Sequence, residues 1–134
     1  FYVAKQMVKK LISLGKNVLG SRVLIMGVTF KENVSDIRNS KVADVVNELK
    51  TYGVSVDVVD PYANPKEIKH EYGFDMVKAT EGKYDAVIVA VSHDQYATLK
   101  EEDFISFLKD SEKGVLFDLK GLYRKNIKTL NFSW

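Results

Sequence analysis

The stretch Val23–Val28 reads VLIMGV, a nearly continuous apolar run that is typical of a strand buried on both faces of a sheet. Two later stretches have the same character: Asp85–Val91 reads DAVIVAV and Val115–Leu119 reads VLFDL. A β-branched run at Val54–Val59 is followed by Asp60-Pro61, where the proline cannot continue a central strand. These stretches are the predicted strands.

Between the predicted strands, apolar residues recur at helical steps of three and four. The predicted helices cover residues 1–18, a segment that starts after the N-cap Ser40 and ends at Gly53, residues 65–72, and residues 101–109. The alternation of buried strands and helices predicts an α/β fold. It is a doubly wound, mainly parallel Rossmann-like sheet with helices on both faces, preceded by an N-terminal helix. The pattern assigns no structure to the tail, Arg124–Trp134.

The composition is that of a globular domain with a hydrophobic core: 134 residues, 46% hydrophobic and 28% charged. Interspersed charges sum to only +2, so we expect no nucleic-acid and no membrane partner. The longest apolar run, Ala86–Val91, is too short to cross a bilayer, and lysines interrupt any signal-peptide core near the start. We therefore expect a cytoplasmic protein. The start at Phe1, within a helical pattern, also predicts a piece of a longer chain.

Cysteine and metal chemistry are not expected in these residues. The chain has no Cys, which excludes disulfides, thiolate metal sites and a cysteine nucleophile within it. No group of His, Asp and Glu has the spacing of metal ligands, so no metal site is predicted.

Ligands of an open parallel sheet bind beyond the carboxyl ends of the strands, which favours the loop after Val28 as the site. Gly27 is the one glycine of this loop, so neither a dinucleotide fingerprint nor a P-loop is present and the loop must bind through side chains. Lys31 and Arg38 suit a phosphate or an oxyanion, with a solvated surface position as the alternative for each. Lys120 follows another strand and is expected to point into the same cleft, where it and Lys31 can hold one phosphate.

Other polar residues near the predicted strand ends have two interpretations each. Asp36 and Arg38 are close enough in sequence to pair and shape their loop. Asp60 ends a predicted strand at the position where an acidic residue of dinucleotide folds accepts ribose hydroxyls, but without the glycine loop a turn or cap residue is the preferred interpretation. His93 and Asp94 can act as an acid and a base, but a solvated loop histidine and a helix N-cap aspartate are the preferred interpretations. From its type alone, Phe30 is more typical of a core residue than of a stacking platform.

Residues 27–40, GVTFKENVSDIRNS, resemble the glycine, Phe-Lys and Asp-x-Arg-x-Ser signature of the UDP-glucose/GDP-mannose dehydrogenase family. The stretches VDVVDPYA, DAVIVAVSHDQY and VLFDLKGLY resemble later parts of the same family, so that the likeness extends over residues 23–123. The resemblance is to the family's C-terminal, UDP-binding domain. It implies that residues 20–134 form this domain and that residues 1–19 end the central interdomain and dimerisation helix.

The resemblance implies a function for the full-length protein: oxidation of a UDP-sugar, UDP-glucose or a UDP-N-acetylhexosamine, to its uronic acid with two NAD. It places NAD mainly on an N-terminal domain and the catalytic cysteine outside this chain, so the fragment alone is expected to be inactive. It assigns substrate contacts to Phe30, Lys31 and Lys120, and an NAD contact to Arg38.

The sequence also bears on the oligomeric state and on a non-catalytic alternative. The resemblance implies a homodimer, and the Asn-Ser after Arg38 is closest to the N-acetylhexosamine branch. The alternative, a stand-alone nucleotide-sensing or interaction module without catalysis, fits the missing cysteine and glycine loop equally well.

Overall fold

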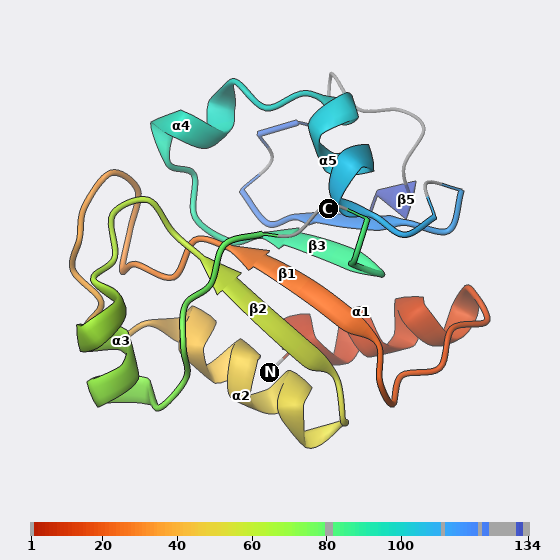
Figure 1. The fold of residues 1–134 in the computed structure, drawn as a ribbon, viewed down its shortest axis with the longest axis horizontal. Coiled ribbons are helices and arrows are strands. Elements are labelled where there is room, and N and C mark those ends of the chain that lie inside the picture. Colours follow the sequence, from red (N-terminus) through yellow and green to blue (C-terminus); the bar gives the residue numbers. More distant parts are fainter. Residues whose placement is uncertain (1, 80–81, 111, 121, 124–130, 133–134) are drawn as a thin grey trace.

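The chain folds into a parallel sheet covered by helices on both faces (Figure 1). The structure, a computed structural model, describes residues 2–79, 82–110, 112–120, 122–123 and 131–132. Within these residues the strands are β1 Arg22–Met26, β2 Ser55–Val59, β3 Ala86–Val89, β4 Val115–Asp118 and β5 Asn131–Phe132. The helices are α1 Tyr2–Ser13, α2 Lys41–Thr51, α3 Pro65–Tyr72, α4 Asp94–Ala97 and α5 Glu101–Phe107. The predicted α/β fold, with its leading helix, is confirmed.

The order of the strands places a topological switch point in the middle of the sheet. The strands lie in the order β2-β1-β3-β4-β5, and each neighbouring pair is parallel. The chain leaves β1 toward β2 on one side and later returns to β3 on the other side. The carboxyl ends of β1 and β3 therefore border the crevice in which an open α/β sheet binds its ligand.

Both faces of the sheet are buried, which explains why the strands read as continuous apolar runs. Ile25, Ile88 and Phe117 lie in one core cluster together with buried residues of α1, α2 and α3. Leu24 and Leu116 belong to a second cluster, which includes buried residues of α4 and α5. Neighbouring residues of one strand thus serve opposite cores, as the two-residue repeat of a strand requires.

Local signals fix the ends of the helices. Ser40 caps α2 by accepting a hydrogen bond from the Ala43 N–H at 3.3 Å. Asn64 caps α3 in the same way, ahead of Pro65 at the first helical position, and Gly73 ends α3 with left-handed backbone at φ 81°. These residues are the start and stop signals that sequence rules anticipate.

Some helices and strands differ in their bounds from those predicted. The first helix ends at Ser13 rather than at residue 18, because Gly15 adopts φ 76° and the Lys16 N–H bonds to the Leu11 carbonyl at 3.0 Å, which closes the helix. The helix α4 was anticipated only by the interpretation of Asp94 as a helix N-cap, and its bounds were not predicted. Residues 74–77 form neither a helix nor a strand, although the Val77 N–H bonds to the Val58 carbonyl at 3.2 Å. Of the tail, residues 131–132 form β5, and residues 124–130 and 133–134 lie outside the described residues.

The amino-terminal edge of the sheet, opposite the switch point, carries a polar cluster around Asp85. Its carboxylate accepts from the Arg22 N–H at 2.9 Å and pairs with Lys16 at 3.2 Å and Lys109 at 3.4 Å. Burial alone would raise the pKa of the Asp85 carboxyl, but the Arg22 N–H and the two ammonium groups together lower it. This cluster connects the loop after α1 to the amino-terminal starts of β1 and β3.

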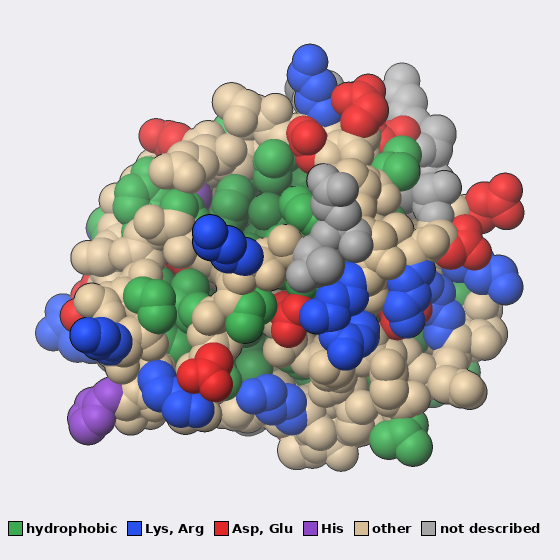
Figure 2. Space-filling model, viewed as in Figure 1, with side chains coloured by type: hydrophobic (Ala, Val, Ile, Leu, Met, Phe, Trp, Pro, Cys, Tyr) green, Lys and Arg blue, Asp and Glu red, His purple; other side chains and the backbone are tan. Residues whose placement is uncertain are grey.

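Basic and acidic side chains are mixed over the molecular face shown in Figure 2. In the described part of the chain, no helix is long and apolar enough to span a membrane.

Candidate nucleotide site at the switch point

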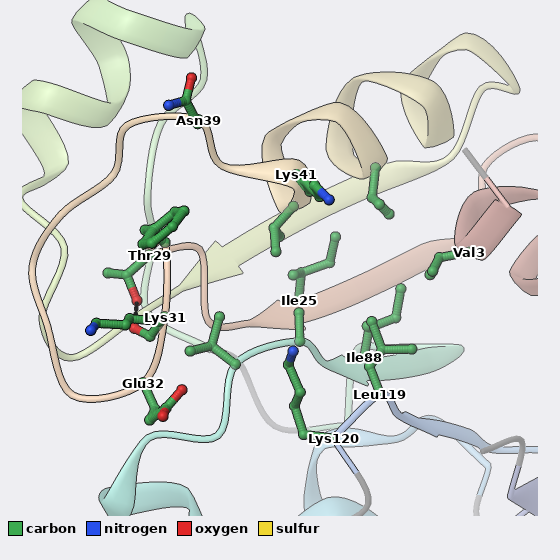
Figure 3. Close-up of a pocket in the computed structure, with 15 residues that line it drawn as sticks. Val3, Ile25, Thr29, Lys31, Glu32, Asn39, Lys41, Ile88, Leu119 and Lys120 are labelled. Atoms are coloured by element: carbon green, nitrogen blue, oxygen red, sulfur yellow. Dashed lines mark hydrogen bonds between the residues drawn. The ribbon is translucent and has the colours of Figure 1, made fainter.

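A cavity of about 390 Å³ opens beside the carboxyl ends of β1, β3 and β4, on the sheet face that carries α1 and α2 (Figure 3). Its floor is apolar, with Ile25 and Ile88 of the sheet and Val42 and Val45 of α2. Charged side chains from two loops surround this floor. The described residues that line it are Val3, Ile25, Thr29, Phe30, Lys31, Glu32, Asn39, Lys41, Val42, Val45, Ile88, Ala90, Val91, Leu119 and Lys120.

Lysines reach this cavity from separate parts of the chain. Lys31 comes from the loop after β1 and Lys120 from the turn after β4, so the prediction that both line one cleft is confirmed. In Figure 3 the Lys120 side chain points toward Ile25 on the floor, while Lys31 extends from the rim. Lys41, the first residue of α2, adds a third ammonium group that the sequence reasoning missed. The signal for it was its place directly after the cap Ser40, at the same edge of the sheet.

Phe30 is 59% exposed and lines the cavity, so the core position that its residue type predicted is wrong. Val28 and Thr29, just before it, are buried at the end of β1, and the chain then turns outward. The Phe30 N–H bonds to the Asp36 carbonyl at 2.6 Å, which closes the loop upon itself. The aromatic ring therefore stands at the rim, where it can contact a ligand.

Arg38 is held by Asp36, as its sequence position predicts. The guanidinium donates to the carboxylate from Nε at 3.1 Å and from Nη2 at 2.9 Å, and the Asp36 carboxylate also accepts from the Arg38 N–H. These hydrogen bonds lower the pKa of Asp36 to about 2. The Arg38 side chain is 84% exposed and lies outside the described lining of the cavity. It is thus pre-oriented on the surface beside the cavity.

Asp60 fulfils the predicted turn role and adds a longer-range one. Its Oδ1 accepts from the N–H groups of Tyr62 at 2.7 Å and Ala63 at 3.1 Å, which forms the turn after β2. Its Oδ2 accepts from the Val28 N–H at 2.8 Å and the Thr29 N–H at 3.3 Å, at the end of β1. One buried carboxylate therefore joins two neighbouring strand ends.

The preferred interpretations of His93 and Asp94 are both wrong. His93 is fully buried, and its Nε2 lies 2.8 Å from Asp60 Oδ2. It occupies the N-cap position of α4, and Asp94 is the first residue of the helix rather than its cap. The partners of His93 are more than thirty residues away in sequence, so no local pattern reveals its burial.

Asp118 orders the turn that carries Lys120. This fully buried residue ends β4, and its carboxylate accepts from the Leu122 N–H at 3.0 Å and the Tyr123 N–H at 2.7 Å. The sequence reasoning missed it, although a lone aspartate inside the apolar run VLFDL was a usable signal, because a buried charge needs partners.

In the part of the chain that the structure describes, no group of His, Cys, Asp and Glu is arranged to hold a metal ion. The cavity brings together lysines, the carboxylate of Glu32, an aromatic ring and apolar surface. Ammonium groups in such a setting can bind a phosphate.

The sequence model of the UDP-glucose/GDP-mannose dehydrogenase family, UDP binding domain, matches residues 24–125. The chain belongs to this family. Proteins similar to this chain include a UDP-N-acetyl-D-glucosamine 6-dehydrogenase of Salmonella typhi, 48% identical over 89% of this chain and 28% of the relative. A protein with the same description from Pseudomonas aeruginosa is 43% identical over 90% of this chain and 28% of the relative. The chain thus spans less than a third of the length of these curated relatives.

Solved structures of the family share the fold. A UDP-D-ManNAc dehydrogenase from Pyrococcus horikoshii superposes with a TM-score of 0.77 at 16% identity, over 98% of this chain and 29% of that chain. An NDP-N-acetyl-D-galactosaminuronic acid dehydrogenase from Methanosarcina mazei also gives a TM-score of 0.77, at 23% identity over 95% of this chain and 27% of that chain. At these identities the likeness concerns the fold alone.

Proposed function

We propose that this chain is the UDP-binding domain of an NAD-dependent nucleotide-sugar 6-dehydrogenase. Residues 20–134 hold the nucleotide, and residues 1–19 end a central helix that leads to an N-terminal NAD domain and takes part in a homodimer. The full-length protein acts in the cytoplasm and oxidises the UDP-sugar to its uronic acid with two NAD. The chain alone is inactive, because it contains no Cys and the oxidation requires a catalytic cysteine outside it.

One observation carries this proposal: Lys31 and Lys120, from loops after different strands, line one cavity at the switch point of a sheet in this family. A diphosphate carries adjacent negative charges, so ammonium groups from separate loops suit it better than a single cation does. The apolar floor of the cavity offers a surface for the flat, weakly polar part of a nucleotide.

Phe30 and Arg38 have distinct roles in this proposal. Phe30 contributes backbone contact and an exposed ring beside Lys31 at the rim. Arg38 lies outside the cavity lining, which suits a contact with NAD across the cleft between domains rather than with the UDP-sugar. The Asn39-Ser40 pair and the UDP-N-acetyl-D-glucosamine 6-dehydrogenases among the relatives support a UDP-N-acetylhexosamine as the substrate.

The experiment is a calorimetric titration of the chain with UDP and, separately, with NAD, at fixed low salt so that phosphate contacts are not screened. We expect saturable UDP binding that the Lys31→Ala variant weakens about tenfold or more, since it loses a charge-assisted contact. Lys66→Ala, an exposed lysine on α3, is the control and should bind UDP as the parent chain does.

The same pair of variants is then compared in steady-state kinetics of the full-length protein with NAD and the nucleotide sugar. A sharp loss of turnover efficiency in Lys31→Ala supports the proposed role. Unchanged kinetics in that variant, or tight binding of NAD without UDP by the chain, would contradict it and favour a dinucleotide sensor.

A further inference from the structure

The exposed tripeptide Phe30–Glu32 lines the cavity and lies between Thr29 and Asn33, which both contact the buried ring of His93. At one end, Thr29 is 2% exposed, and its Oγ1 lies 3.3 Å from Nε2 of His93. At the other end, the Asn33 N–H donates to Nδ1 of the same ring at 2.9 Å. A single imidazole therefore contacts both ends of the segment that presents Lys31.

The hydrogen-bond partners determine which nitrogen of His93 carries the proton. The Asn33 backbone N–H can only donate, so Nδ1 must be the unprotonated acceptor. Nε2 then bears the hydrogen and donates to Asp60 Oδ2 at 2.8 Å. Because Asp60 also binds the N–H groups of Val28 and Thr29, the ring is anchored to the ends of β1 and β2.

Asn33 strengthens the second attachment. Its backbone is left-handed at φ 59°, a conformation that asparagine tolerates better than most residues. Its side-chain Oδ1 accepts from the Asp94 N–H at 2.8 Å, while its own N–H binds His93. Two hydrogen bonds thus join Asn33 to the start of α4.

We propose that His93 is a positioning residue that fixes both ends of the Thr29–Asn33 segment and thereby presents Phe30 and Lys31 to the nucleotide. It is fully buried and does not line the described cavity, so it acts through the segment rather than on the ligand. Thr29 helps inside the segment, because its Oγ1 donates to the Lys31 carbonyl at 2.9 Å. The role of the segment as a ligand contact rests on the proposed function, whereas the attachment itself does not.

Two variants separate the two halves of the ring. His93→Gln places its amide near the position of Nε2 and loses the acceptor for Asn33, whereas His93→Asn places an acceptor near the position of Nδ1. His70→Gln is the matched control, since His70 is the other histidine of the chain and lies exposed on α3.

The first measurement is hydrogen exchange by mass spectrometry in the full-length protein, on the peptide that contains residues 29–33. We expect His93→Gln to accelerate exchange of this peptide about tenfold, the effect of losing one or two hydrogen bonds. His93→Asn should restore much of the protection, and His70→Gln should leave it unchanged. Unchanged exchange in a folded His93→Gln variant overturns the attachment.

The second measurement is steady-state kinetics of the same variants. We expect His93→Gln to raise KM for the nucleotide sugar about tenfold with little change in kcat, because the segment contacts the nucleotide equally before and during the reaction. Recovery in His93→Asn supports positioning, since a merely structural role would lower the melting temperature of both variants and leave KM unchanged. Faster exchange with an unchanged KM overturns the positioning role.

Failure of the proposed function and failure of a variant to fold can each be distinguished from failure of the His93 attachment. If the parent protein binds no UDP, the proposed function fails, and the exchange measurement alone decides whether His93 holds the segment. If His93→Gln does not fold, Thr29→Val replaces it, because valine lacks the Oγ1 that contacts Nε2 of His93. Thr29→Ser, which retains the hydroxyl, is its control, and equal exchange of residues 29–33 in this pair overturns the attachment.

Discussion

Lys120 stands on a turn that the buried carboxylate of Asp118 holds through two backbone N–H groups. Lys31 is held on its own loop by the hydrogen bonds of Thr29, Asn33 and Asp60. The ammonium groups themselves remain free to adjust at the ends of flexible side chains. Buried acids and a histidine therefore order the backbone, while exposed lysines line the cavity.

The shape of the cation at position 120 should determine how tightly the chain binds UDP. Lys120→Ala should weaken UDP binding about tenfold or more, because one charge-assisted contact is lost. Lys120→Arg should bind at least as well as the parent chain, since a guanidinium can grip a phosphate with two parallel hydrogen bonds. Calorimetric titration with UDP measures both variants. Unchanged binding by Lys120→Ala would show that Lys120 does not face the nucleotide.

Arg38 should affect the binding of NAD rather than of UDP. Arg38→Ala should raise KM for NAD about tenfold in the full-length protein and leave the affinity of the chain for UDP unchanged, because the guanidinium lies outside the described cavity lining. Lys66→Ala serves again as the exposed control. A defect confined to the UDP-sugar would place Arg38 on the substrate side instead.

At the scale of elements, the end of β1 and the segment after β3 approach each other closely. Gly27 has φ 100°, and a Cβ at this position would lie 2.7 Å from Val91 Cβ and 2.9 Å from the Val91 nitrogen. The glycine follows β1, and its N–H bonds to the Val59 carbonyl at 2.9 Å. It therefore serves close packing at the switch point rather than phosphate binding by the backbone.

This approach predicts a specific loss of stability. Gly27→Ala should lower the free energy of unfolding by about 2–5 kcal/mol, as the sum of left-handed strain and overpacking. Gly73→Ala is the matched control, with φ 81° and no atom within 4 Å of the added Cβ, and should cost only the strain of about 1–2 kcal/mol. Urea denaturation measures both. Equal losses in the two variants would mean that the contact with Val91 relaxes freely.

The elements also show where sequence reasoning succeeds. The buried strands were predictable because continuous apolar runs such as Val87–Val89 have few other solutions in a chain of this composition. The caps Ser40 and Gly73 follow local rules. The placement of Lys31 and Lys120 at one cleft was predictable because parallel strands bring their carboxyl ends to one edge.

Local sequence patterns could not predict the buried hydrogen bonds that order the site. The burial of His93 depends on Asp60 and Asn33, which only the folded sheet brings beside it. The early end of α1 depends on Gly15, whose left-handed backbone competes with the continuing apolar stripe. Three-dimensional partners, rather than periodicity, decide both features.

Across the whole molecule, the carboxyl and amino edges of the sheet carry different groups. The carboxyl edge carries the cavity, and the amino edge carries the Asp85 cluster, in which Lys16 and Asp85 are both largely buried. The carboxyl edge can thus keep exposed cations beside the cavity while the amino edge contributes ionic stabilisation of the fold.

The far edge predicts how the protein responds to acid. The pKa of Asp85 is lowered in the folded chain, so its stabilising effect is fully present above the unfolded value of about 4 and is lost as the pH falls through the folded pKa. Asp85→Asn should lower the free energy of unfolding by about 1–3 kcal/mol at pH 7. The difference between the variant and the parent should shrink at low pH. Denaturation at a series of pH values checks this, and a difference independent of pH would exclude the carboxylate as its source.

The loop after β1 presents Lys31 as a side chain where other sheets of this type present backbone amides. Backbone amides are common to every residue except proline, so a ligand contact made through them does not depend on the chemistry of a side chain. A single nucleotide change can turn a lysine codon into the codon of another residue. Because buried partners order the loop independently of Lys31, codon changes at positions 31 and 120 alter charge and reach while the scaffold stays intact. The site is consequently open to gradual change of its ligand, in nature or in directed evolution.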